Sequence, residues 1–330
     1  MAEGHGASEY AMSMEDDEKT YGRAANNGSR DGAGEVQEER EVPLPAFDDA
    51  QPLEIPKEII REDLREAQLQ AQRDEDHHTP REPYIVFDHV FKSFGDLKVL
   101  EDVSFEVLTG ETLCILGRSG TGKSVTLQCI MGFLKPDRGR ILVASEDITH
   151  MNEEQLEMVR KKVTMVFQSG ALFDSLSVGE NVAFPLRERK ELDEEQIQKI
   201  VNGLLEMVGV AGMAQLLPSD LSTGMKRSVA IARALAAQPE AILYDEPTTM
   251  VDPLIGRLLG DLIHKLKSQL LLTSVVVTHD MRFAERLADH VMFLHQGKVH
   301  FFGTTEEMKT SDDEIVQQFL RLDTLVLPAV

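Results

Sequence analysis

The sequence has few basic residues, few cysteines and no long apolar run. Its 330 residues include 34 lysines and arginines against 57 aspartates and glutamates, which gives a formal net charge of −23. Nucleic-acid binding depends on clustered basic residues that neutralise phosphates, so we expect no binding of DNA or RNA. No run of about 18 apolar residues occurs, so the sequence predicts no membrane-spanning helix. Any role at a membrane therefore has to come through a partner.

The two cysteines, Cys114 and Cys129, lie in apolar segments. Small apolar positions of this kind predict buried, reduced core residues, which is typical of a cytosolic protein. The first residues also lack a positively charged region followed by an apolar stretch, so we expect no secretory leader. These features predict a cytoplasmic location.

Acidic residues are concentrated at the start of the chain. Residues 1–82 contain 22 aspartates and glutamates against 9 lysines and arginines, with few large apolar side chains. Such a segment buries too little apolar surface to offset chain entropy, so we expect a mostly disordered acidic extension. Within it, Ile60, Leu64 and Ala67 recur at helical spacing. A solvated helix and a helix that docks on a partner are both compatible with this spacing.

A complete phosphate-binding loop follows a short apolar run. Residues 111–116 have the composition of a buried strand, and residues 117–124 read GRSGTGKS. The glycines of such a loop let backbone N–H groups turn towards a polyphosphate, Lys123 reaches the outer phosphates, and the Ser124 hydroxyl suits Mg²⁺. The apolar stretch Val125 to Leu134 predicts the helix that follows. The sequence therefore predicts nucleotide binding.

Strand-like and helix-like segments alternate along the rest of the chain. Two alternating apolar segments before the loop predict antiparallel strands, with turns near Gly95 and Gly110. After the loop, strands separated by helices predict a parallel sheet covered on both faces. A helix is predicted over Asp193 to Val208 because its apolar residues recur every three or four positions. The predicted strands cover residues 84–87, 103–107, 163–167, 241–245 and 274–278.

Polar residues follow three of these strands. Asp245 and Glu246 end one strand, Gln168 follows another, and His279 follows a third. Parallel strands deliver such residues to a crevice at their carboxyl ends. Asp245 would hold Mg²⁺, while Glu246 would point at the water that attacks the γ-phosphate. Gln168 would touch Mg²⁺ and the attacking water, and His279 would hydrogen-bond the γ-phosphate.

Residues 221–225, with the sequence LSTGM, introduce a predicted helix over Lys226 to Ala237. Ser222 is a good helix N-cap, and Gly224 permits close backbone approach. An ordinary capped helix and a second phosphate-binding helix terminus both fit these residues.

From about Tyr84 to Thr304 these motifs, in this order, resemble the ATP-binding-cassette (ABC) ATPases. The motifs are an aromatic loop at Phe94, Walker A at 117–124, a Q-loop at Gln168, the signature at 221–225, Walker B at 242–245, the catalytic Glu246, a D-loop at Asp252 and the switch His279. The resemblance implies a P-loop NTPase fold of the α/β class, with a RecA-like mixed sheet and an antiparallel β subdomain. It places the ATPase domain at residues 83–304, its helical signature subdomain at about 172–235, and a C-terminal extension at 305–330. Residues 316–320 have spacing suited to a short helix.

The resemblance also implies ATP and Mg²⁺ as ligands and a head-to-tail homodimer that sandwiches two ATP molecules. Each ATP would contact one copy's Walker A and the other copy's signature. The implied catalytic residues are Lys123, Gln168, Glu246 and His279, and the implied metal ligands are Ser124, Gln168 and Asp245. Phe94 would stack on adenine, although a residue at a strand end can equally pack in the core. The implied nucleotide-binding set is Phe94, Gly117, Arg118, Ser119, Gly120, Thr121, Gly122, Lys123, Ser124, Thr126, Ser222, Gly224 and Asp252.

Residues 166–174, residues 181–188 and Met225 are similar to the Mla and Mce-associated ATPases of bacterial lipid transport. This similarity implies phospholipid transport between membranes and a peripheral location on the inner face of the cell membrane. The implied partners are an integral membrane permease, an Mce-type substrate-binding protein and a small regulatory subunit. An importer ATPase for a small polar solute and a soluble cassette without a transport role remain alternatives.

Two positions depart from the family pattern. Thr223 stands at a signature position that is glycine in the family, and its Cβ would strain a backbone with positive φ or crowd the γ-phosphate. The D-loop has Met250 and Val251 before Asp252, which is bulkier than usual. Both departures fall in segments that are expected to contact the second copy in the dimer.

Overall fold

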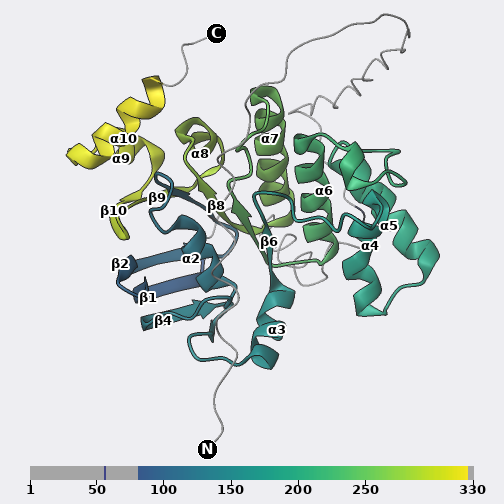
Figure 1. Cartoon of the computed structure of the whole chain (residues 1–330), viewed down its shortest axis with the longest axis horizontal. Helices are drawn as coiled ribbons and strands as arrows, with labels where there is room; N and C mark the ends of the chain where they lie inside the picture. Colours follow the sequence, from purple (N-terminus) through teal and green to yellow (C-terminus); the bar gives the residue numbers. More distant parts are fainter. Residues whose placement is uncertain (1–55, 57–80, 326–330) are drawn as a thin grey trace, which may run out of the picture. The chain divides into compact units, whose positions relative to one another are not determined.

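The computed structural model describes residue 56 and residues 81–325. The predicted disorder of residues 1–82 and the helical spacing around Ile60 therefore lie outside the described residues, except for Pro56, Arg81 and Glu82. The described residues form two β-sheets and the helices around them (Figure 1).

The first sheet is antiparallel and has the strand order β2-β1-β4-β5. As predicted, the chain turns at Gly95 between its first two strands, which pair along their length. Alternate residues of β2 from Val103 to Val107 are buried, so one face of this sheet covers the core while the other meets solvent. The strands are β1 (Pro83–Phe94), β2 (Leu97–Leu108), β4 (Arg138–Val143) and β5 (Glu146–Asp147).

The second sheet is mixed and has the order β10-β9-β3-β8-β7-β6. Its five neighbouring strands from β9 to β6 run parallel, and β10 pairs antiparallel with β9 at one edge. Every residue of β3 and β8 is buried, as expected for central strands covered on both faces. The strands are β3 (Thr112–Leu116), β6 (Val163–Val166), β7 (Ala241–Asp245), β8 (Thr273–Thr278), β9 (His290–His295) and β10 (Lys298–Gly303). This architecture confirms the predicted mixed-sheet P-loop NTPase fold.

Two apolar cores lie on opposite faces of this sheet. Leu113 and Ile115 of β3 belong to the core shared with β1, β2, β4, α2 (Lys123–Ile130) and α3 (Glu153–Lys162). Cys114 and Leu116 belong to the other core, which contains the remaining helices. Both cysteines are free and buried, and burial raises the pKa of the Cys129 thiol to about 12.

Helix α2 is shorter than the sequence predicts. It ends at Ile130 and not at Leu134, so that prediction is wrong. The chain leaves the helix at Gly132, whose φ of +67° suits glycine, and the N–H of Phe133 donates to the carbonyl of Gln128 at 2.9 Å. The apolar residues beyond Ile130 therefore pack as a turn.

Three helices form the signature region: α4 (Val178–Arg189), α5 (Glu194–Met207) and α6 (Thr223–Ala236). The helix predicted over Asp193 to Val208 is α5, with Asp193 as its N-cap and Val208 as its C-cap. A short 3₁₀ turn at Pro218–Asp220 leads into α6. Ser222 caps α6 through a hydrogen bond from the N–H of Met225, as predicted.

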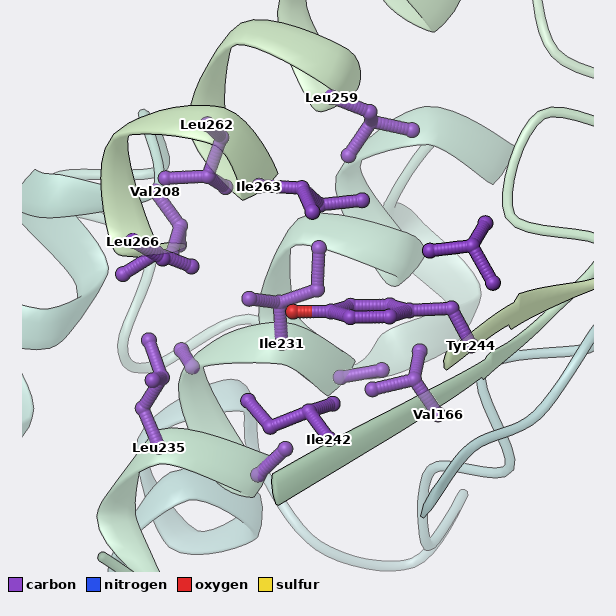
Figure 2. Packing of buried hydrophobic residues seen from close by; sticks show 14 of the residues in the cluster. Val166, Val208, Ile231, Leu235, Ile242, Tyr244, Leu259, Leu262, Ile263 and Leu266 are labelled. Carbon is purple, nitrogen blue, oxygen red and sulfur yellow. The ribbon is translucent and has the colours of Figure 1, made fainter. Parts of the chain in front are cut away.

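Helices α6 and α7 (Pro253–Leu270) pack against β7 through aliphatic side chains (Figure 2). Tyr244 points from β7 towards Ile231 of α6 and Ile263 of α7. Its side chain is 1% exposed. This packing fixes α6 and α7 relative to the strand that ends at Asp245.

The C-terminal segment packs on its own chain. Helices α8 (Met281–Leu287), α9 (Thr305–Lys309) and α10 (Glu314–Leu325) follow the central strands. Phe319 of α10 lies against Phe293 of β9, with ring centroids 4.8 Å apart, and belongs to the same core as the sheet. Between residues 81 and 325, no helix is long and apolar enough to cross a membrane.

The substitution Leu204→Ala should destabilise the signature region. Leu204 lies on α5 with no exposed surface, so truncation leaves a cavity and should lower the free energy of unfolding by about 2–5 kcal/mol. Asn202→Ala on the exposed side of the same helix is the control, with an expected change within about 0.5 kcal/mol. Urea unfolding followed by circular dichroism measures both. Equal midpoints for the two variants would contradict the assigned burial of α5.

Candidate functional site

The phosphate-binding loop joins β3 to α2. Gly122 is the N-cap of α2 with a φ of +105°, and no side chain caps this helix. An added Cβ at Gly122 would lie 2.8 Å from the Val99 carbonyl oxygen, so only glycine fits without displacement. The uncapped N–H groups of α2 therefore remain available to an anion, which the helix dipole also favours.

Lys123 is held by the loop that precedes it. Its Nζ donates to the carbonyl of Gly117 at 2.8 Å and to that of Arg118 at 3.1 Å. The side chain is 6% exposed. Nζ also lies 3.3 Å from Oε1 of Glu246, which brings together two residues 123 positions apart. A buried ammonium group at this place is suited to pairing with outer phosphates of a nucleotide.

The carboxylate of Glu246 lies among three partners. Besides Lys123, its Oε2 accepts from Nδ1 of His279 at 2.8 Å and from the hydroxyl of Thr249 at 3.0 Å. The carboxylate is 13% exposed, whereas the His279 side chain is 57% exposed. The site therefore pairs a largely buried acid with a more exposed imidazole.

These contacts change the pKa values of both groups. Burial alone would raise the pKa of Glu246, but the hydrogen bond from His279 and the charge of Lys123 outweigh it and lower that pKa. The hydrogen bond to Glu246 raises the pKa of His279 above its usual 6.5, although burial of the ring partly lowers it. The stabilisation from Glu246 is lost as pH falls through its lowered pKa, and that from His279 is lost as pH rises through its raised pKa. The pair is charged between these two limits.

Asp245, at the end of β7, is hydrogen-bonded to Ser124 of α2. The Ser124 hydroxyl donates to Oδ1 of Asp245 at 3.0 Å. Burial raises the pKa of Asp245, and the charge of Glu246 raises it further. The hydrogen bond from Ser124 lowers this pKa but does not outweigh the rise. A buried carboxylate beside a hydroxyl is the type of oxygen donor set that Mg²⁺ prefers. No cluster of three or more His, Cys, Asp or Glu suited to a metal occurs among the described residues, so protein ligands alone would leave most of the coordination to phosphates and water.

A cavity of about 750 Å³ is lined by Lys123, Ser124 and Glu246, whereas Asp245 is not among its lining residues. Gln168, Glu246 and His279 line it, as the sequence predicts, together with Thr249 and two apolar residues of β2, Leu97 and Val99. No motif pointed to the β2 residues, because they come to the cavity through tertiary packing, in which the N–H of Glu101 also donates to the Gly297 carbonyl at 2.8 Å. The loop residues that line the cavity are Arg118, Ser119, Gly120, Gly122, Lys123 and Ser124.

Gly117, Thr121 and Thr126 make hydrogen bonds within the loop and the first turn of α2. Gly117 contributes a carbonyl to Lys123, and the Thr121 hydroxyl donates to the Arg118 carbonyl at 2.9 Å. Thr126 is fully buried, and its hydroxyl donates to the Gly122 carbonyl at 3.1 Å. Thr126 therefore lies on the buried side of α2 and does not line the cavity. Its hydrogen bond stabilises the first turn of the helix.

Phe94 lies at the end of β1 and is 47% exposed, so it is not a core residue. Its ring lies under the Lys92 ammonium, 5.5 Å from Nζ to the centroid. Phe94 is not among the residues that line the cavity. Its exposed ring remains available for stacking.

The signature and D-loop residues do not reach this cavity. Ser222 caps α6 at the surface, and Asp252 caps α7 through a hydrogen bond from the N–H of Leu254 at 2.8 Å. Gly224 is buried against Ile255, where an added Cβ would lie 2.4 Å from Cγ2. Within one chain the structure thus brings together the Walker residues, Gln168 and His279, and leaves Ser222, Gly224 and Asp252 apart from them.

The expected backbone strain at Thr223 is absent. Thr223 is the first residue of α6, and no positive φ occurs there, so that part of the prediction is wrong. A threonine is tolerated because the helix has already begun. Among the non-glycine residues that line the cavity, Glu246 has a left-handed backbone, with a φ of +47°.

The sequence profile of the ABC transporter family matches residues 100–249 of the chain. The intermembrane phospholipid transport system ATP-binding protein MlaF of Haemophilus influenzae is 42% identical over 227 residues, which cover 69% of this chain and 86% of that protein. The chain belongs to the ABC transporter family. As a member of this family, it is an ATP-hydrolysing transport ATPase.

Further relatives carry different names. Protein TRIGALACTOSYLDIACYLGLYCEROL 3, chloroplastic, of Arabidopsis thaliana is 40% identical over 70% of this chain and 71% of its own length. The probable ribonucleotide transport ATP-binding protein mkl of Mycobacterium leprae is 39% identical over 69% of this chain and 66% of its own. Among solved structures, the dimeric post-hydrolysis state of the ATP-binding cassette MJ0796 bound to ADP and Pi matches with a TM-score of 0.63 and 31% identity, covering 67% of this chain and 98% of that one.

The bond between His279 and Glu246 can be followed by NMR titration of the histidine ring. In the parent protein the pKa of His279 should lie above 6.5, and Glu246→Gln should bring it down towards 6.5 because the bonded charge is removed. Asp280→Asn is the control. It neutralises an adjacent carboxylate that does not bond the ring, so its effect should be smaller. An equal effect of both substitutions would contradict the assigned hydrogen bond.

Proposed function

We propose that this ATPase drives phospholipid transport as the nucleotide-binding subunit of a membrane transporter. The observation that carries the proposal is the 42% identity to the phospholipid-transport protein MlaF over 86% of its length. The mkl relatives, named for ribonucleotide transport, favour a solute transporter as a second candidate. The catalytic residues would be the same in both cases, so the two candidates differ in the membrane partner and its substrate.

In the proposed mechanism, Lys123 and the N–H groups of α2 bind the outer phosphates of ATP. Binding draws Lys123 away from Glu246, because the phosphates compete for the same ammonium group. Glu246 then accepts a proton from the attacking water, and His279 holds the Glu246 carboxylate or bonds the γ-phosphate. Gln168 lies at the cavity wall, where it can orient the water. When bound, Mg²⁺ would supply charge neutralisation on the phosphates, with Ser124, Asp245 and Gln168 as its protein contacts.

The chain is proposed to act as a head-to-tail dimer. Ser222 and Gly224 lie apart from the cavity of their own chain, so a second copy would have to supply them. Exposed apolar side chains flank the D-loop Asp252, with Met250 89% and Leu254 63% exposed, and a partner copy would cover them. The dimeric MJ0796 structures support this arrangement.

A surface beyond Gln168 is proposed to bind the permease. Asn181, which is fully buried, accepts from the N–H of Phe173 at 2.8 Å and donates to the carbonyls of Leu176 and Ser177, so it fixes the segment before α4. This holds Phe173 against Phe184, with ring centroids 5.1 Å apart. The two rings are 46% and 42% exposed. A rigid, exposed aromatic pair suits a protein partner, and the cassette would thus be peripheral to the membrane on its cytoplasmic face. An Mce-type protein and a small regulatory subunit complete the proposed complex.

The substitution Glu246→Gln should lower the rate of ATP hydrolysis by about 10²–10⁴-fold, because the amide cannot accept the proton from water. ATP binding should be retained, and ATP should trap a dimer. Phosphate release, fluorescent-nucleotide binding and size-exclusion chromatography with ATP measure the three effects. Glu157→Gln, an exposed acid of α3 that pairs with Lys161, is the control and should hydrolyse ATP normally. Hydrolysis by Glu246→Gln at the parental rate would show that another group is the base.

The substitution Phe184→Asp should prevent co-purification with the permease, because a charge replaces half of the aromatic pair. The full chain is purified from detergent-solubilised membranes, and the bound protein and small molecules are identified by mass spectrometry. Phe302→Asp is the control, since Phe302 is 43% exposed but lies on β10. Recovery of phospholipid with the parent complex supports lipid transport, and recovery of nucleosides supports the second candidate. Recovery of no membrane protein with the parent would contradict both.

A further inference from the structure

Arg227 of α6 connects the signature helix to the turn that contains Glu246. Its guanidinium donates from one terminal nitrogen to the carbonyl of Glu246 at 2.8 Å and from the other to the carbonyl of Thr249 at 2.9 Å. The side chain is 3% exposed. The two carbonyls belong to one turn, in which the N–H of Thr249 also approaches the Glu246 carbonyl at 3.3 Å. One guanidinium therefore bridges both ends of this turn.

The turn needs such support because the backbone of Glu246 is in the left-handed region. A glutamate at a φ of +47° is an unfavourable conformation that persists only where its surroundings impose it. On one side, the N–H of Glu246 donates to the Val277 carbonyl of β8 at 2.9 Å. On the other side, Arg227 holds its carbonyl. The backbone of Glu246 is thus fixed from both directions.

The same turn orients the carboxylate. The Thr249 hydroxyl donates to Oε2 of Glu246 at 3.0 Å, and the Thr249 carbonyl is the second acceptor of Arg227. Displacement of Thr249 would therefore move a direct partner of the carboxylate. Burial lowers the pKa of Arg227, and the charges of Asp245 and Glu246 oppose this change.

We propose that Arg227 is a positioning residue that holds Glu246 in the geometry required for ATP hydrolysis and links that geometry to the start of α6. The inference rests on the proposed role of Glu246. Only arginine has a planar group whose two ends reach two carbonyls, so lysine would keep the charge and lose one of the bonds. Ser222, the N-cap of the same helix, lies five residues earlier, about 7.5 Å along the helix axis. A displacement of Ser222 would consequently be transmitted to Glu246 through α6 and Arg227.

The test compares Arg227→Lys with the parent full-length chain. We expect kcat to fall by about 10–100-fold, as for a misplaced catalytic group, with KM for ATP changed less than about threefold. In the Glu246→Gln background, Arg227→Lys should cause no further fall, because Arg227 acts through Glu246. Additive losses, or a rise in KM with kcat unchanged, would overturn the proposal.

Arg189→Lys is the matched control. Arg189 donates to the carbonyl of Ala237 and to Gln238 at the far end of the same helix, so it supports α6 without touching the Glu246 turn. It should leave kcat and KM as in the parent. An equal fall of kcat in Arg189→Lys would show a general effect of helix stability and would overturn the positioning role.

A second measurement does not depend on hydrolysis. Amide hydrogen exchange in residues 246–251 should be faster in Arg227→Lys than in the parent, since the turn loses its bridge, while exchange in α5 should be unchanged. Unchanged exchange in residues 246–251 would overturn the proposal even if the parent proved inactive. An inactive parent with faster exchange in the variant would instead count against the proposed function and keep the positioning role.

Discussion

Three neighbouring parallel strands, β3, β8 and β7, end at the same edge of the six-stranded sheet. Leu116 pairs with Thr278 and Asp245 with Val277, so the residues that follow each strand leave the sheet at the same level. Lys123, His279 and Glu246 come from these three ends and meet within hydrogen-bond or ion-pair distance. A shift in the register of any one strand would separate them. Strand pairing therefore determines which charged side chains of the site lie within contact distance of one another.

Much of this arrangement is predictable from the sequence because the relevant signals are local. Glycines mark the loop, apolar runs mark the buried strands, and Asp193 and Ser222 mark helix starts by their capping chemistry. Parallel strands then require the polar residues after them to gather at one edge. Local signals were less reliable where packing decides the outcome. The apolar residues after Ile130 suggest helix, yet Gly132 ends it.

The contacts that fix Glu246 could not be predicted in this way. Its left-handed backbone and its bridge to Arg227 depend on α6 packing against β7, and no motif reports such packing. Likewise, the spacing of Val316 and Phe319 predicts an apolar helix face without saying what covers it, and the structure shows that the covering surface includes Phe293 of the same chain. Amphipathicity indicates that a face is buried, whereas only the fold identifies its partner.

Helix α6 carries a second guanidinium, six residues after the first, that also bonds main-chain carbonyls. Arg233 donates to the carbonyls of Ala171 and Gly170, just beyond Gln168, and lies 5.7 Å from the Phe173 ring. One helix therefore holds the backbone of the Glu246 turn through Arg227 and the backbone of the segment before Phe173 through Arg233. All four hydrogen bonds are accepted by carbonyls, so they constrain the position of the main chain. Arg227 and Arg233 thus tie the Glu246 turn and the segment before Phe173 to the same helix within a single chain.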